Sequence, residues 1–180
     1  MQNADDFDEF YATTSRRLVG QLFAMTGDLQ EAQDAVQEAY IRAWQRWPRI
    51  QGYHYREAWI RTVAYRISAN AWSKARNRLV ASHRASRDAE QPEISPDLLT
   101  LVGALRKIPE AQRRAIILHH LVGLSIEEIA AETGAPAGTV KARLARGRKA
   151  LAPLVSDSDE PPPSRRTHPT EQSTETIAHA

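Results

Sequence analysis

Aromatic and basic side chains alternate along one stretch of the chain in a pattern that suits an unpaired nucleic acid. The aromatic residues are Tyr53, Tyr55, Trp59, Tyr65 and Trp72, and the basic residues are Arg56, Arg61, Arg66, Lys74, Arg76 and Arg78. Flat rings stack on exposed bases, at about 1–3 kcal/mol per base, while cations follow the phosphate backbone. The pattern therefore predicts contact with a single strand or with a duplex that is being opened. Because Trp59 lies on an apolar helix line, we expect it in the core, as we expect Trp44. The better candidates for base contact are then Tyr53, His54 and Tyr55.

A second basic segment follows the signals of a helix-turn-helix. Ser125 and Glu128 have the spacing of a capping box, and Gly134 stands where the end of a short helix needs a left-handed residue. Pro136 then begins a second helix, with five cations and no acid in residues 139–150. Such a helix enters the major groove, where Lys and Arg reach phosphates and base edges. For this helix-turn-helix, Ser125 to Leu144, the expected DNA contacts are Pro136, Gly138, Thr139, Lys141, Ala142, Arg143, Ala145 and Arg146. The alternative is a plain helical hairpin with a basic solvent face.

The net charge of +2 averages over blocks of opposite sign. Residues 1–40 carry eight acidic and two basic side chains, residues 41–88 carry eleven basic and two acidic ones, and residues 156–180 have a net charge of −3. Two separated basic segments after an acidic start indicate one polyanion that is held in two places. The alternative is that each basic run is only a solvated helix face.

The elements that must position these side chains all read as helices. Apolar residues recur at three- and four-residue steps, and no segment alternates with period two. Asp28 and Glu31 predict the capped start of one helix, which stops at Trp47-Pro48, and a long helix is expected over about residues 55–78. The prediction is an all-α fold of two small helical domains, 5–79 and 96–155, joined by a flexible linker, 80–95. A proline-rich tail, 156–180, is expected to be disordered because it has too little apolar surface to bury.

Composition excludes several other classes of protein. The 180 residues include no cysteine, which removes disulfide scaffolds, thiol nucleophiles and Cys-ligated zinc and suits a reducing cytosol. No apolar stretch approaches the ~20 residues of a membrane span, and the acidic start lacks the order of a signal peptide. We therefore expect a cytoplasmic protein without membrane insertion.

The adjacent His119 and His120 raise the alternative of an enzyme with a metal or acid–base site. Neighbouring helical residues point about 100° apart, so this pair cannot chelate one ion as an i, i+4 pair can. We expect one ring to be half-buried and the other solvated, with no metal, no cofactor and no catalytic residue. Two further alternatives are a response-regulator-type or one-component DNA-binding protein, for which no receiver domain or dimer interface is visible, and a helical RNA-binding protein.

Three motifs in register resemble the extracytoplasmic-function sigma factors, group IV of the bacterial sigma-70 family. Residues 34–44 resemble the helix with which that family binds core RNA polymerase. Residues 49–52 and 58–61 resemble the loop and helix that open and read the minus-ten promoter element. Residues 108–113, 123–130 and 138–144 resemble region four, which reads the minus-thirty-five element. The resemblance extends from about Phe7 to Leu154, in the family's order and with its linker.

This resemblance implies a sigma factor that directs promoter-specific initiation and is not an enzyme. The residues that bind the polymerase core, on its beta-prime clamp, would be Asp34, Val36, Gln37, Glu38, Tyr40, Ile41 and Trp44, and the second domain would contact the beta flap. The minus-ten contacts would be Ile50, Gln51, Tyr53, His54, Tyr55, Arg56, Arg61, Arg66, Asn70 and Lys74.

Other implications concern the loop, the linker and a regulatory partner. The Ile50–Tyr55 loop would hold a flipped non-template base, and the linker around 81–95 would thread toward the active-site channel of the polymerase. Such factors are often held by an anti-sigma factor. The chain departs from the family pattern at two minus-ten positions: Arg66 stands where many members carry Asn, and Ile50 where an aromatic residue is usual.

Overall fold

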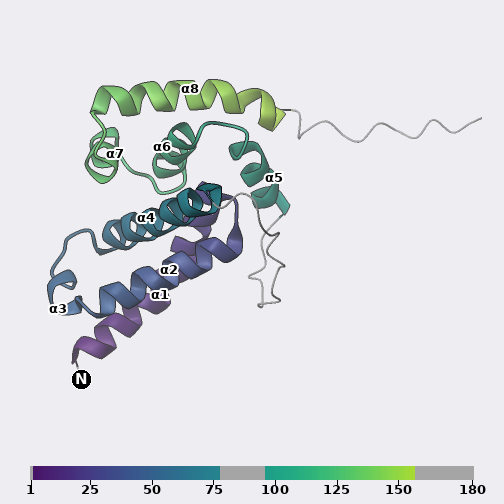
Figure 1. Cartoon of the computed structure of the whole chain (residues 1–180). Helices are drawn as coiled ribbons and strands as arrows, with labels where there is room; N and C mark the ends of the chain where they lie inside the picture. The colour runs from purple at the N-terminus through teal and green to yellow at the C-terminus, as the bar shows by residue number, and fades with distance from the viewer. Residues whose placement is uncertain (1, 78–95, 157–180) are drawn as a thin grey trace, which may run out of the picture.

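The computed structural model describes residues 2–77 and 96–156 (Figure 1). Its helices are α1 (Gln2–Thr26), α2 (Leu29–Trp44), α3 (Trp47–Ile50), α4 (Arg56–Asn77), α5 (Pro96–Leu105), α6 (Glu110–His120), α7 (Ile126–Thr133) and α8 (Ala137–Ser156). These two ranges contain no strand, so the predicted all-α fold is confirmed. The predicted linker 80–95 lies outside the described residues, and so does the predicted tail 156–180 except for Ser156, which is the last residue of α8. Among the described helices, none has the length and apolar character needed to cross a membrane.

Local signals set the junction between α1 and α2 as predicted. Gly27 ends α1 with a φ of 78°, and the carboxylate of Asp28 accepts a hydrogen bond from the backbone N–H of Glu31 at 2.9 Å. The helix expected to stop at Trp47-Pro48 ends earlier, at Trp44. Trp47 and Pro48 instead begin a separate short helix, α3, which takes in the first two residues of the loop expected over residues 49–54. Proline fits there because the first turn of a helix needs no backbone N–H bond.

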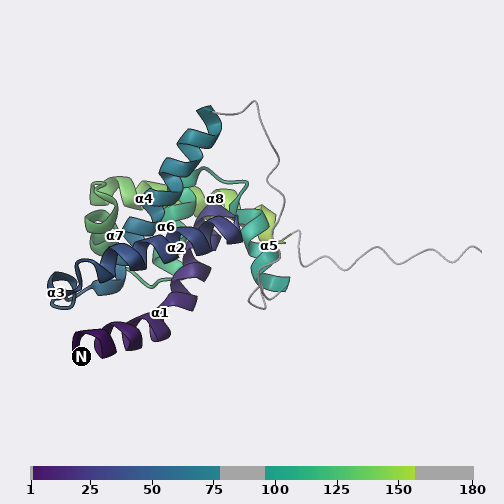
Figure 2. The same ribbon diagram turned by 60° about the horizontal axis from the view of Figure 1, so that its bottom comes forward.

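The first half is a bundle in which α2 lies between α1 and α4 (Figures 1 and 2). Three alanines of α2, Ala32, Ala35 and Ala39, are fully buried, and such small side chains allow the neighbouring helices to approach closely. Larger side chains from the flanking helices, among them Leu22 and Ile60, fill the space beside them. This packing positions α4, which carries half of the predicted minus-ten residues.

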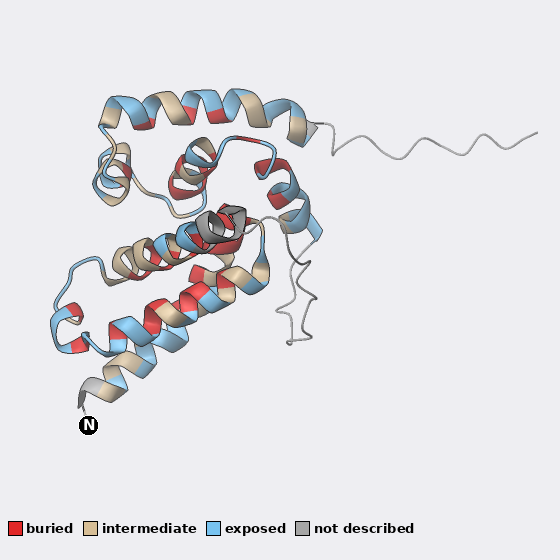
Figure 3. Cartoon of the chain, viewed as in Figure 1, coloured by how far each residue is buried: buried red, intermediate tan, exposed pale blue. Residues whose placement is uncertain are grey.

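The second half packs against the first. The buried side chains of both halves belong to one hydrophobic cluster, which includes Leu18 and Ile60 from the first half and Leu118 and Leu144 from the second (Figure 3). Helix α1 contacts α5 and α6, and α4 contacts α7. Because of these contacts, the two predicted domains share buried surface in this structure.

The most buried residues of α4 lie one position after those of the predicted apolar line, which begins at Trp59. Ile60, Ala64 and Ser68 are the most buried, with exposed fractions of 0%, 1% and 2%, whereas Trp59 is half-buried at the edge of the core. Helix α4 is covered by α1 and α2 on one side and by α7 on another. Its buried face is therefore wider than a single apolar stripe.

The helix-turn-helix has the local geometry that the sequence predicts. The Ser125 hydroxyl accepts from the N–H of Glu128 at 3.1 Å, and the Glu128 carboxylate accepts from the N–H of Ser125 at 2.8 Å. Gly134 is left-handed, with a φ of 69°. Val140 and Leu144, each 1% exposed, hold α8 in the core.

Candidate nucleic-acid and polymerase interface

The loop between α3 and α4 exposes the aromatic side chains that the sequence singled out. Tyr53 is 37% exposed and Tyr55 is 63% exposed, and the ring of His54 meets that of Tyr55 edge-on, with centroids 4.6 Å apart. Ile50, by contrast, is 1% exposed. Its predicted contact with a base does not fit this burial, because the side chain is part of the core and anchors the start of the loop.

Arg56, at the start of α4, is engaged within the protein. Its guanidinium carbon lies 5.3 Å from the ring centroid of Phe10 and 5.7 Å from that of Trp47, within the range of cation–π attraction. Its Nη1 is 3.4 Å from a carboxylate oxygen of Asp6. These contacts fasten the end of the loop to α1 and α3. Arg56 therefore has a structural role, because it holds the loop in place.

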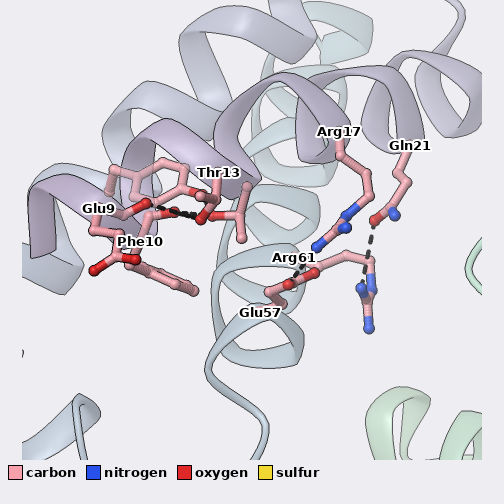
Figure 4. A network of polar contacts seen from close by, with 9 residues as sticks. Glu9, Phe10, Thr13, Arg17, Gln21, Glu57 and Arg61 are labelled. Carbon is pink, nitrogen blue, oxygen red and sulfur yellow. Dashed lines mark hydrogen bonds and ion pairs between the residues drawn. The ribbon is translucent and has the colours of Figure 1, made fainter. Parts of the chain in front are cut away.

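Arg61 has the least expected surroundings of the predicted minus-ten residues. Its Nε and Nη2 donate to the two carboxylate oxygens of Glu132 at 3.0 and 2.6 Å, and its Nη1 donates to Gln21 at 3.4 Å. Figure 4 shows Arg61 directed toward Gln21 of α1, beside the ion pair of Arg17 with Glu57. The side chains of Arg61 and Glu132 are each only 5% exposed. The predicted strand-contacting cation is therefore buried against α7.

The remaining members of the predicted minus-ten set lie farther along α4 or in the loop. Arg66 and Asn70 are exposed, as a contact to DNA would require. The side chain of Gln51 is half-buried and donates to the carbonyl oxygen of Pro48 at 3.3 Å. Lys74 is in α4, but its side chain lies outside the described residues.

Tyr65 is a second point at which α4 meets the other half. Its hydroxyl donates a hydrogen bond to Glu110 of α6, and the guanidinium carbon of Arg114 lies 3.7 Å from the centroid of its ring. Burial raises the pKa of Tyr65 to about 12, and the bond to Glu110 acts in the same direction. Burial also lowers the pKa of Arg114, against the opposing effect of Tyr65.

Most of the predicted DNA contacts of α8, and of Pro136 directly before it, are exposed to solvent. The exposed members are Pro136, Gly138, Thr139, Lys141, Ala145 and Arg146. Ala142 and Arg143 are half-buried. Arg143 lines a cavity of about 300 Å³ together with Tyr65, Arg114 and Val140, so one predicted duplex reader faces the junction between the two halves.

Helix α2 divides the predicted polymerase-binding residues into a buried and an exposed group. Val36 and Tyr40 are each 3% exposed and belong to the core, which does not fit a direct contact with another protein. The exposed or half-buried group is Asp34, Gln37, Glu38, Ile41 and Trp44. Trp44 is 49% exposed, so its expected place in the core is wrong, while its place on a contact surface fits.

In the histidine pair, one ring is half-buried and the other is exposed, as the sequence predicts. His119 is half-buried, with its Nδ1 2.8 Å from the carbonyl oxygen of Leu124, and His120 is exposed. Partial burial lowers the pKa of His120, and the neighbouring His119 and Arg148 act in the same direction. In the part of the chain that the structure describes, no three His, Cys, Asp or Glu side chains are grouped so that they could hold a metal ion.

The sequence also matches known families and proteins. The family model "Sigma-70 region 2" matches residues 10–78, and the family model "Sigma-70, region 4" matches residues 98–151. The RNA polymerase sigma-H factor of Pseudomonas aeruginosa is 31% identical, over 84% of this chain and 89% of that protein. The ECF RNA polymerase sigma-E factor of Escherichia coli K12 is 33% identical, over 66% of this chain and 70% of that protein.

Solved structures show the same likeness. The sigma factor RpoE of Bartonella quintana, solved in complex with the anti-sigma factor NepR, has a TM-score of 0.67 and 27% identity, and covers 84% of this chain and 97% of its own. CnrH, solved with the cytosolic domain of CnrY, shares the fold with a TM-score of 0.58 and 20% identity. The two matched regions, the helix-turn-helix and the exposed aromatic loop all indicate the same family. The chain belongs to the extracytoplasmic-function sigma factors, and it directs promoter-specific transcription initiation as a subunit of RNA polymerase.

Proposed function

We propose a division of labour in which residues 5–79 act as sigma region 2, residues 96–155 as sigma region 4 and residues 80–95 as the linker between them. The matches to residues 10–78 and 98–151 support these limits. The exposed or half-buried group on α2, consisting of Asp34, Gln37, Glu38, Ile41 and Trp44, contacts the beta-prime clamp of the polymerase. Val36 and Tyr40 support that surface from inside the core.

The loop before α4 is the proposed minus-ten reader. The observation that carries this assignment is the exposure of Tyr53, His54 and Tyr55 on a loop that the buried Ile50 anchors. A flipped base loses its stacking in the duplex, and an aromatic face restores part of that energy. Arg66 and Asn70, exposed farther along α4, then contact the opened strand.

Helix α8 is the proposed minus-thirty-five reader. Its exposed cations Lys141 and Arg146 reach phosphates and base edges, while the small side chains at Gly138 and Ala142 allow close approach. The buried Val140 and Leu144 fix its angle to α7.

The experiment begins by finding promoters of this factor. Core polymerase with the full chain transcribes fragmented genomic DNA, and sequencing of the transcript 5′ ends identifies the promoters that it uses. Permanganate reactivity of unpaired thymines at such a promoter then measures strand opening. Tyr55→Ala is expected to reduce opening, whereas Leu99→Ala, which removes a similarly exposed apolar side chain on α5, leaves opening unchanged. Equal opening with both variants would contradict the assignment of the loop.

An anti-sigma factor is the proposed regulatory partner, because the matched structure of the Bartonella quintana factor is a complex of that kind. We place the activity in the cytoplasm, with core RNA polymerase, and assign the chain no catalytic residue of its own. Affinity purification of the full chain from native cells, followed by mass spectrometry, tests both partners together. Recovery of core polymerase without any inhibitor would support the first partner and contradict the second.

A further inference from the structure

Helix α8 has an exposed basic face that no acidic side chain of the described residues neutralises. Its exposed cations are Lys141, Arg146, Arg148 and Lys149, and residues 139–150 contain no acid. None of the four cations forms an ion pair within residues 2–77 and 96–156. Such a cluster of like charges attracts any anionic group that can reach it.

The basic face lies opposite the side of α8 that packs on the core. Val140 and Gly147 are buried, and at about 100° of rotation per residue Lys149 lies almost directly opposite both. The other three exposed cations lie within roughly 100° of Lys149. Ser156, the last residue of α8, stands seven positions after Lys149, so almost two full turns return the chain to the same side. The chain therefore leaves α8 on its basic side.

The residues that follow α8 carry the opposite charge. Residues 157–180 contain five acidic and two basic side chains. Three of the acids, Asp157, Asp159 and Glu160, come within four positions of the end of the helix. The C-terminal end of a helix carries partial negative charge, which repels acids directly beyond it. The same acids are attracted where they lie back along the cations of α8.

The length of this acidic segment suits the length of the basic face. Lys141 lies roughly 22 Å before Ser156 along the axis of α8, at about 1.5 Å per residue. Four extended residues span about 13 Å, and three prolines add about 9 Å in the extended polyproline form. Residues 157–163, laid back along the helix, therefore reach Lys141, and their acids lie beside the three cations nearest the helix end.

We propose that residues 157–160 dock on the basic face of α8 and compete there with duplex DNA. A single exposed ion pair is weak, but the short connection to the helix gives the acids a high effective concentration at the face. Duplex DNA has a denser negative charge and displaces them. The competition with DNA rests on the proposed minus-thirty-five role of α8, whereas docking itself does not.

Paramagnetic relaxation in the full-length protein tests docking. Because the chain has no cysteine, Ser164→Cys provides one site for a nitroxide spin label, directly after the three prolines. In the docked state the label lies beside the start of α8 and should broaden the backbone amide signals of residues 139–143. The tail-neutral variant, Asp157→Asn with Asp159→Asn and Glu160→Gln, should lose most of this broadening. Salt at about 0.5 M should have the same effect, because it screens exposed charges.

Matched controls separate docking from a general change of charge. The α1-neutral variant, Asp5→Asn with Asp8→Asn and Glu9→Gln, removes three exposed acids from α1 and should leave the broadening unchanged. Lys149→Glu should reduce the broadening, whereas Lys107→Glu, at an exposed position outside α8, should not.

Three results would overturn the proposal. The first is the absence of broadening in the parent protein, and the second is unchanged broadening in the tail-neutral variant and in Lys149→Glu. The third comes from a mixture of spin-labelled protein with isotope-labelled protein that carries no spin label. Broadening in this mixture would place the acidic segment on another copy of the chain.

Binding of the free, full-length protein to a duplex that carries the minus-thirty-five element of a mapped promoter supplies the second measurement. At about 50 mM salt, the tail-neutral variant should bind at least about threefold more tightly than the parent, because a tethered competitor has been removed. The α1-neutral variant should stay within about 1.5-fold of the parent, and the advantage of the tail-neutral variant should shrink as the salt concentration rises.

The two measurements together distinguish docking from the proposed role of α8. If the acidic segment docks and its neutralisation leaves duplex affinity unchanged, docking stands and the minus-thirty-five role of α8 fails. If neutralisation strengthens duplex binding although the parent shows no broadening, the role stands, the acids only repel DNA from a distance, and docking is overturned.

Discussion

The hydroxyl oxygen of Thr14 on α1 lies 2.6 Å from the phenol oxygen of Tyr40 on α2, inside the first bundle. Thr14 also donates to the carbonyl oxygen of Phe10, which leaves the phenol as donor in the bond between the two side chains. Tyr40 is 3% exposed, and the rings of Phe7, Phe10 and Tyr11 surround it. Tyr40, which the sequence assigned to the polymerase-binding surface, therefore joins α1 to the inner face of α2.

Tyr40→Phe is expected to lower the free energy of unfolding by about 1 kcal/mol, the usual net contribution of one buried hydrogen bond. The change keeps the ring contacts, so packing does not contribute to the loss. Urea unfolding followed by circular dichroism measures the difference. Tyr11→Phe is the control, because Tyr11 is 44% exposed, and its effect should stay within about 0.5 kcal/mol. A loss of the same size in both variants would contradict the role of the buried bond.

Alkaline pH should destabilise the protein through the same tyrosine. Burial raises the pKa of Tyr40 to about 12 from its ordinary value of 10.0. Between these values the unfolded chain releases the phenolic proton and the folded chain keeps it, so stability is complete below pH 10 and falls as the pH rises toward 12. Denaturant midpoints measured across this range should fall less steeply in Tyr40→Phe than in the parent protein. Parallel curves would mean that other groups cause the loss.

A side chain at Gly27 is expected to destabilise the protein. Its φ of +78° disfavours any residue with a Cβ, and a Cβ there would lie 2.5 Å from a side-chain carbon of Arg106. Gly27→Ala should therefore reduce stability by about 1 kcal/mol or more, because a left-handed conformation with a Cβ costs that much. Gly20→Ala is the matched control. Nothing lies within 4 Å of its Cβ position in α1, and alanine there should add up to about 1 kcal/mol. Thermal unfolding of the pair should show shifts of opposite sign.

The capping box at α7 should be needed for the helix-turn-helix. Ser125→Ala is expected to cost about 0.5–2 kcal/mol, the usual effect of losing an N-cap side chain, while Ser125→Thr retains the oxygen and most of the stability. The hydrogen bonds from Ser125 lower the pKa of Glu128 below its ordinary value of 4.5. Their stabilising effect is therefore present above that value and is lost as the pH falls through the folded-state pKa. Hydrogen exchange of α7 should accelerate in the alanine variant alone.

Local chemistry made the helix-turn-helix predictable. Ser125, Glu128 and Gly134 act on backbone groups within a few residues of themselves, so their spacing alone determines the geometry. The same holds for the cap at Asp28. Pro48 could not be placed in this way. A proline can follow the end of one helix or lie in the first turn of the next, so the sequence did not predict α3.

Contacts between distant segments could not be read from the sequence. Arg61 and Glu132 are separated by 71 positions in the sequence. Within its own helix, each is a charged residue of the kind that usually faces solvent. Burial of Ile50 and exposure of Trp44 likewise depend on which helices cover them, since both are apolar residues at helical spacing. Hydrophobic periodicity predicts that a helix has a buried face, but neighbouring elements decide how wide the face is and where it ends.

Two arginines of α8, Arg143 and Arg146, are predicted to read DNA, and they differ in exposure. Arg146 is exposed, whereas Arg143 is half-buried beside the cavity that Tyr65 also lines. Within the polymerase complex, replacing either arginine with alanine should weaken minus-thirty-five recognition by about 1–3 kcal/mol if the lost contact is bidentate to guanine. Initiation at a mapped promoter, compared with a promoter mutated in its minus-thirty-five element, measures recognition. Full activity of both variants on the intact promoter would remove α8 from the proposed reading surface.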